Sequence, residues 1–153
     1  MGVGDEVTIV YNKLFLPVGE MTAEATKIHG LTKKTLQKKE AAKFSADDAE
    51  VVFSVVSGAK GLIAHNKEFE QTVLRNAFSV VGKLELFAML PTWQCTMELA
   101  RKKENATAKH LNLGWLCQTL ELGIGTRPKY HDASWDVFAT AKLFLRLSNE
   151  PQS

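Results

Sequence analysis

The chain has 153 residues and a net charge of +2, with 45% hydrophobic and 24% charged residues. This balance is typical of one folded domain, and it excludes a disordered chain and a protein that binds polyanions through its overall charge. Because no apolar run approaches the roughly 20 residues that cross a bilayer, and the start lacks a signal-peptide pattern, we expect no association with a membrane.

The first part of the chain predicts one strand and two helices. Val7–Leu16 alternates and is rich in β-branched and aromatic residues, which predicts a strand. Residues 22–30 predict a short helix that ends at a glycine. Ser45, with an acidic residue three positions later, predicts the capped start of a helix that ends near Gly58. That helix has an apolar stripe expected to face the core, made of Val51, Val52, Val55 and Val56.

The middle of the chain predicts an alternation of strands and helices. Gly61–Ala64 is short and apolar, which favours a buried strand. Lys67–Val81 has apolar residues at helical spacing and ends at a glycine. Leu84–Leu90 fits either a helix or a strand. Thr92–Thr96 predicts a short strand, and Met97–Arg101 predicts a helical turn.

The last part of the chain predicts two helices. Asn112 is a good N-cap for a helix over Leu113–Leu122, and Asp132 can cap the last helix. Because strands and helices alternate, the fold class is α/β. We expect one domain over residues 1–148, followed by a flexible tail at 149–153.

The cysteines, the tryptophans and several lysines favour structural roles. Cys95 and Cys117 are far apart and lack a zinc-ligand spacing, which favours buried, reduced thiols in a cytoplasmic protein. The tryptophans are most simply interpreted as core residues, namely Trp93, Trp115 and Trp135. One group of lysines favours a solvated face over a track for phosphates, namely Lys33, Lys34, Lys38 and Lys39.

Three short segments carry the candidate chemistry. His131 lies just before the last predicted helix, and Asp136 lies in its first turn. An imidazole with a carboxylate can activate a water molecule beside a bound metal ion. Two earlier segments, Ile28–Thr32 and Ala64–Glu70, add further polar residues, namely His29, His65, Asn66 and Glu70.

Five segments, taken in order, resemble an exonuclease family whose metal site consists of three Asp and one Glu, with a catalytic His. They are residues 25–32, 64–70, 95–101 and 111–117, and His131 with Asp136. The likeness runs from about Gly4 to Leu147. It implies a ribonuclease-H-like mixed sheet flanked by helices, and an enzyme that removes nucleoside 5′-monophosphates from the 3′ end of a nucleic acid.

The resemblance also implies roles for individual residues. Glu70 and Asp136 would be metal ligands for two Mg²⁺ or Mn²⁺ ions, which prefer oxygen ligands. His131 would be the general base. The residues that border the substrate would be His29, His65 and Asn66. The implied partners are the 3′ end of single-stranded DNA or RNA and a polymerase subunit.

Two features depart from the family pattern. Family members begin with a strand that carries an Asp-x-Glu pair, and no such pair lies on a predicted strand before Ile28. Asp48 and Glu50 have this spacing but fall in a predicted helix. Glu70 stands where the family usually has Asp. We therefore expect an N-terminally incomplete fold that lacks the first one or two strands, with weak or absent metal binding by this chain alone.

Several interpretations stay open at this point. The chain could be a truncated nuclease, one part of a split enzyme whose missing strands come from another polypeptide, or a non-catalytic nucleic-acid-binding or adaptor domain of the same fold. Some candidate site residues also have a purely structural interpretation. His131 could cap a helix, His29 could shape a turn, and His65 with Asn66 could bind backbone groups after the strand.

Overall fold

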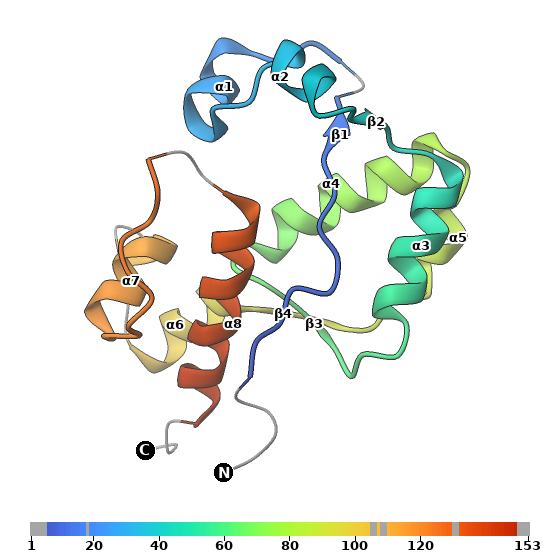
Figure 1. Ribbon diagram of the computed structural model, residues 1–153. Helices are drawn as coiled ribbons and strands as arrows, with labels where there is room; N and C mark the ends of the chain where they lie inside the picture. Colours follow the sequence, from blue (N-terminus) through green and yellow to red (C-terminus); the bar gives the residue numbers. More distant parts are fainter. Residues whose placement is uncertain (1–5, 18, 105–106, 108–109, 130–131, 150–153) are drawn as a thin grey trace.

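The computed structural model describes residues 6–17, 19–104, 107, 110–129 and 132–149. Within these residues the chain is a mixed α/β fold of eight helices and four short strands, which confirms the predicted class (Figure 1). In chain order the elements are β1 (Phe15–Leu16), α1 (Ala23–His29), α2 (Lys33–Lys38), β2 (Ala42–Lys43), α3 (Ala46–Val56), β3 (Leu62–Ala64), α4 (Lys67–Val80), α5 (Leu84–Ala88), β4 (Trp93–Cys95), α6 (Thr96–Lys103), α7 (Leu113–Thr119) and α8 (Ala133–Asn149).

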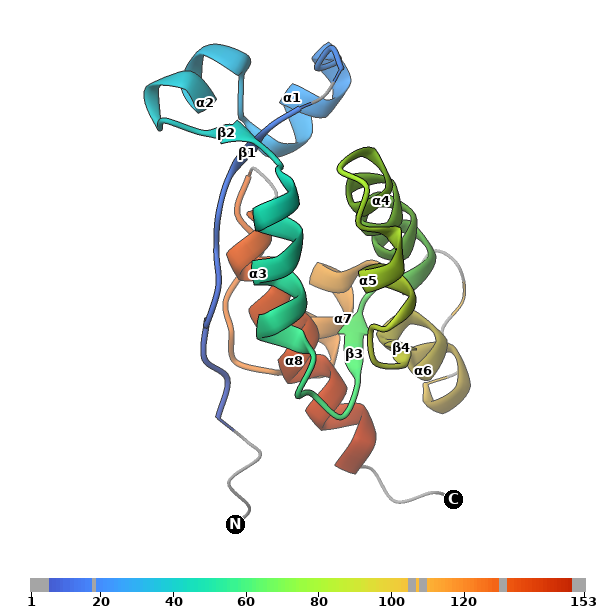
Figure 2. The same cartoon turned by 90° about the vertical axis from the view of Figure 1, so that its right-hand side faces the viewer.

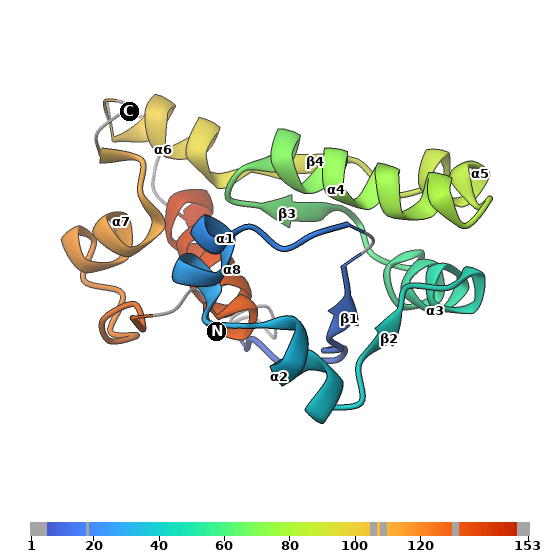
Figure 3. The same cartoon turned by 90° about the horizontal axis from the view of Figure 1, so that it is seen from above.

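The described strands form two separate parallel pairs. β1 pairs with β2, with Phe15 opposite Ala42. β3 pairs with β4, with Leu62 opposite Trp93, and the connection between them contains α4 and α5. Figure 3 shows α4 running along this second pair, against which it packs. A parallel pair joined through a helix is the unit that alternating strands and helices predict.

Local capping sets the ends of the early helices. The Thr22 side chain accepts a hydrogen bond at the start of α1, and Gly30 ends that helix with φ at 69°. Ser45 and Asp48 form a reciprocal capping box at the start of α3. These predicted helices are confirmed. Helix α2 was not predicted from the sequence. Thr32 caps this helix, and its lysines are exposed.

The main core lies between α6, α7 and α8. Helix α8 contributes a fully buried stripe, and α7 packs its apolar face onto it. The buried members are Ala100, Leu111, Leu113, Leu116, Cys117, Ala139, Leu143 and Leu147. Cys95 and Cys117 are both buried and free, as predicted. Burial raises the pKa of the Cys117 thiol to about 11.

A line of phenylalanine rings joins the β1–β2 pair to the rest of the protein. Phe15 contacts Phe44 edge to face at 5.2 Å between ring centroids. Phe44 stacks on Phe78 of α4 at 5.9 Å, and Phe78 contacts Phe87 of α5 at 6.3 Å. Such pairs add specific geometry to the burial of apolar area, so these rings fix β1 and β2 above α4 and α5.

The predicted first strand is wrong over most of its length. Only Phe15 and Leu16 form a strand, and residues 7–14 are extended without a ladder. A strand needs a partner to pair its backbone groups, and this segment runs beside α3, apart from the β3–β4 pair (Figure 2). Residues 8–11 cover part of the valine face of α3 and enclose a small apolar pocket of about 250 Å³.

Four predictions, three about burial and one about helix length, are also wrong in part. Val51 and Val55 of α3 are 47% and 42% exposed, because little packs on this side of the helix. Ile63 is 39% exposed, because one edge of β3 is uncovered by the described residues, and Trp115 is 40% exposed. The helix predicted over 113–122 ends at Thr119, since the chain turns at Glu121, whose φ is 52°.

Candidate functional site

A cleft of about 800 Å³ opens at the carboxyl end of β3, between α4, α8 and the start of α7. Apolar side chains form much of its wall, among them Ile63, Val73, Met97 and Val137. Its polar lining includes seven residues from different parts of the chain: His65, Asn66, Glu70, Asn112, Arg127, Asp136 and Thr140. Ligand sites in α/β folds commonly lie outside the carboxyl ends of strands.

Glu70 and Asp136 reach this cleft because both lie in the first turn of a helix. Asn66 caps α4 by accepting a hydrogen bond from the Phe69 N–H at 3.4 Å. Asp132 accepts a hydrogen bond from the Ser134 N–H at 2.9 Å at the start of α8, as predicted for a cap. Helix N-termini favour negative charge. Glu70 as a whole residue is exposed. Its carboxyl is nevertheless partly desolvated, and this desolvation, together with the nearby charge of Asp136, raises the pKa of that carboxyl.

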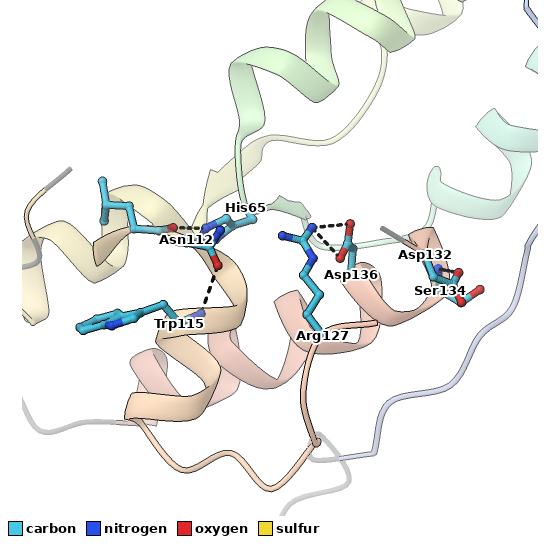
Figure 4. Close-up of polar contacts among 8 residues, drawn as sticks. His65, Asn112, Trp115, Arg127, Asp132, Ser134 and Asp136 are labelled. Atoms are coloured by element: carbon cyan, nitrogen blue, oxygen red, sulfur yellow. Dashed lines mark hydrogen bonds and ion pairs between the residues drawn. The ribbon is translucent and has the colours of Figure 1, made fainter. Parts of the chain in front are cut away.

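Arg127 lines the cleft, and this role was not predicted from the sequence. Its Nη2 atom donates to both carboxylate oxygens of Asp136, each at 2.9 Å (Figure 4). The loop that carries Arg127 has no periodic pattern, so nothing in the sequence indicates where its side chain points. Its stem runs past Gly114, where a Cβ would lie 3.5 Å from Arg127 Cβ, an ordinary contact distance.

His65 uses both of its ring nitrogens within the protein. Nε2 donates to the Leu111 carbonyl at 2.5 Å, so Nδ1 is the acceptor of the Thr96 hydroxyl at 2.7 Å. Burial lowers the pKa of His65 and Arg127 lowers it further, against the opposing effects of Leu111 and Asp136. The neutral ring joins the end of β3 to α6 and to the segment before α7. Its contact with substrate stays a prediction.

The other predicted site residues lie in different places. His29 ends α1, accepts the Leu31 N–H at Nδ1 at 3.0 Å, and does not line the cleft. Asn66 lines the cleft as well as capping α4. His131 lies outside the described residues, so its role as general base stays a prediction.

The acidic pair on α3 has structural partners. Asp48 pairs with Lys13 at 2.7 Å and closes the capping box with Ser45, while Glu50 pairs with Lys83 at 2.8 Å. This pair therefore lies in a helix, as predicted, and both carboxylates are engaged there.

The cleft does not fit a pair of divalent cations with the side chains that the structure describes. Glu70 and Asp136 are its two acidic residues, and no group of three or more His, Cys, Asp or Glu close enough to hold a metal occurs in the described part of the chain. Magnesium favours six oxygen ligands, and two ions at 3.5–4 Å require shared carboxylates. Both oxygens of Asp136 are also occupied by Arg127.

Comparison with known proteins assigns the chain to a family. No curated protein matches the chain. No helix among the described residues has the length and apolar character needed to cross a membrane. A family model described as Exonuclease matches residues 2–144, nearly the whole chain. The chain belongs to the DEDD exonuclease family, whose members share a ribonuclease-H-like fold.

Proposed function

We propose that the cleft between α4 and α8 is the catalytic cleft of a 3′–5′ exonuclease that releases nucleoside 5′-monophosphates. One observation carries this proposal. Glu70 and Asp136, which lie far apart in the sequence, face the same cleft at the carboxyl end of β3. The substrate would be the 3′ end of single-stranded DNA or RNA, and a polymerase subunit is the partner that the family suggests.

The residues of this chain would have distinct roles in the cleft. Glu70 and Asp136 would supply carboxylate oxygens, and His131 would take a proton from the attacking water. Asn66 and His65 border the space where the terminal nucleotide would lie, and His29 would approach it from α1. The family generally uses divalent metals, and Mg²⁺ or Mn²⁺ would supply charge stabilisation once more carboxylates are in place.

The open edge of β3 is where we expect those carboxylates to enter. The Leu62 N–H donates to the Thr92 carbonyl at 2.8 Å, so the backbone groups of Leu62 face β4. Successive residues of a strand alternate, so those of Ile63 face the opposite edge, where the described residues place no strand. Exposed apolar side chains flank this edge, with Val137 57% and Val73 49% exposed.

We expect a β-strand that carries acidic residues to dock on this edge, either as part of a longer chain or as a separate polypeptide. Its backbone would pair with Ile63, and its acidic side chains would reach the cleft beside Glu70 and Asp136.

The buried, reduced thiols favour a cytoplasmic location for this activity.

The test is an exonuclease assay on oligonucleotides labelled at either end. The protein would be assayed alone and with the residues encoded in frame before Met1, or with a small polypeptide that copurifies with it. We expect little release by the chain alone and stepwise release from the 3′ end by the completed protein. His131→Ala should lower that rate by roughly 10²–10⁴-fold. Release from the 5′ end would contradict the proposal.

One observation favours a second candidate function, a nucleic-acid-binding or adaptor domain without catalysis. In its ion pair with Asp136, Arg127 occupies a carboxylate that a nuclease would need as a metal ligand. If the completed protein binds single-stranded oligonucleotides but releases no mononucleotide with either Mg²⁺ or Mn²⁺, this second function replaces the first.

A further inference from the structure

The contact between Arg127 and Asp136 is more than a surface ion pair. One guanidinium nitrogen donates to both oxygens of the carboxylate at 2.9 Å. Both side chains are largely covered, 19% exposed for Arg127 and 31% for Asp136. Figure 4 shows the guanidinium between His65 and Asp136, and all three residues line the cleft. The positive charge therefore lies where a cation bound to Asp136 would have to enter.

Two further contacts hold Arg127 in this position. Its stem lies against the start of α7, where a Cβ at Gly114 would be 3.5 Å from Arg127 Cβ and 3.7 Å from Cδ. Its Cζ lies 5.9 Å from the centre of the Trp135 ring, a cation–π distance. Packing and charge together therefore set the position of the Arg127 side chain.

The hydrogen bonding of Arg127 is nevertheless incomplete. Its Nε is buried and has no hydrogen-bond partner among the described residues. A buried N–H group without a hydrogen-bond partner is unfavourable. The folded protein therefore keeps the guanidinium here at a cost, which makes it easier to displace than a fully bonded one.

The charge of Arg127 also has a clear effect on the cleft. Asp136 lies close enough to Glu70 to act on its pKa by charge. Two carboxylates that share a partly covered cleft repel one another unless a positive charge lies between them or beside them. Arg127 supplies a positive charge beside Asp136, and the same charge lowers the pKa of His65.

We propose that Arg127 is a resident counterion, which occupies Asp136 in place of a divalent cation and must leave before Asp136 can bind one. The proposal rests on the function proposed above, which makes Asp136 a metal ligand. It predicts that Arg127 and a divalent cation exclude one another, because both need the same carboxylate oxygens and both are positive. Arg127 would thus keep the Asp136 carboxylate paired until a cation and further carboxylates arrive.

The test measures Mn²⁺ binding to the full chain, through the electron paramagnetic resonance signal of free Mn²⁺. Arg127→Gln removes the charge and keeps a polar side chain of similar length. It should bind Mn²⁺ at least tenfold more tightly than the wild type. Arg101→Gln is the matched control, because it removes the same charge from an exposed position on α6 and should change the affinity less than twofold.

A second variant locates the effect. Adding Asp136→Asn to Arg127→Gln should abolish the gain, because the oxygens that bind Mn²⁺ are then no longer charged. The proposal is overturned if Arg127→Gln binds Mn²⁺ no more tightly than Arg101→Gln, or if the gain persists without the Asp136 carboxylate. Circular dichroism shows which variants are folded.

Arg127→Lys replaces Arg127→Gln if the latter does not fold. Lysine keeps the positive charge but lacks the planar fork of arginine, so it holds the carboxylate less firmly. It should bind Mn²⁺ at least threefold more tightly than the wild type, and an unchanged affinity overturns the proposal. These outcomes are independent of the nuclease assay. A tighter Mn²⁺ site in Arg127→Gln, together with a completed protein that releases no mononucleotide, would refute the proposed function and leave the counterion in place.

Discussion

At the scale of one residue, His65 shows how the fold uses a side chain for which the resemblance implies a contact with substrate. Its position after a strand could be predicted, because the pattern around residues 61–64 is local. Its partners could not, because Thr96 and Leu111 lie 31 and 46 residues away in the sequence. Arg127 was missed for the same reason. Its role depends on Asp136 and Gly114, which only the folded chain brings to it.

The lowered pKa of His65 predicts a particular pH dependence of stability. The unfolded chain takes up a proton at this residue near pH 6.5, while the folded chain resists it. Stability from this group is therefore present above pH 6.5 and is lost as the pH falls through the lower folded value. Urea unfolding between pH 5 and 7.5 should show this loss in the wild type.

Two variants separate His65 from the other histidines. His65→Gln should lack this part of the acid-induced loss, and should cost roughly 1–3 kcal/mol at pH 7.5 because buried partners lose their hydrogen bonds. His110→Gln, which removes an exposed imidazole, should keep the wild-type pH dependence. Equal pH dependence in the wild type and His65→Gln would contradict this account.

At the scale of elements, most helices and the strands β3 and β4 could be predicted, but helix α2 and the pairing of the first predicted strand could not. Helix signals are local: Ser45 and Asp48 form the box that their spacing predicts, and Asn112 caps α7 through the Trp115 N–H. Strand pairing depends on residues distant in sequence. Val7–Leu16 has the composition of a strand, but only its last two residues find a partner.

Helix α3 provides a test of its capping box. Asp48→Ala removes the carboxylate that accepts hydrogen bonds from the Ser45 N–H and the Ser45 hydroxyl, and it removes the ion pair with Lys13. The free energy of unfolding should fall by about 1–2 kcal/mol, because the N3 half of the capping box is lost while Ser45 still caps the helix. Asp47→Ala changes the exposed neighbour in the same turn, and should cost less than about 0.5 kcal/mol. Equal losses in the two variants, measured by urea unfolding, would show that the box contributes nothing.

The end of α1 provides a second test at this scale. Gly30 has a φ of 69°, which side chains with a Cβ adopt only with strain. Gly30→Ala should lower the free energy of unfolding by about 1 kcal/mol. Gly58→Ala is the control, because this exposed glycine has open space for a Cβ and lacks a positive φ. Thermal unfolding that ranks the two substitutions in the opposite order would contradict the assignment.

At the scale of the whole molecule, the described residues form two packed parts that meet around an open cleft. The main core lies between α6, α7 and α8, and the phenylalanine rings hold β1, α4 and α5 together. The cleft and the uncovered edge of β3 lie between them. The resemblance identified the family and the two carboxylates. It could not show that Arg127 would pair with Asp136.

Hydrogen exchange provides a direct test of the open edge of β3. In the chain alone, the Ile63 amide should exchange faster than that of Leu62, which is bonded to Thr92. In the completed protein the Ile63 amide should become at least tenfold slower, because the docked strand would bond to it. Leu62 is the internal control and should change little. An Ile63 amide already as protected as that of Leu62 in the chain alone would show that this edge is not available.

The central claim is that Glu70 and Asp136 belong to one nuclease site, and a time course of mononucleotide release tests it most directly. The substrate is single-stranded DNA labelled at its 3′ end, and the enzyme is the completed protein with Mg²⁺. Asp136→Asn and Glu70→Gln should each lower the rate by at least about 100-fold, since each removes a charge that the transition state requires. Glu68→Gln removes an exposed charge from the same turn of α4 and should leave the rate unchanged. Release at the wild-type rate by either cleft variant would contradict the account.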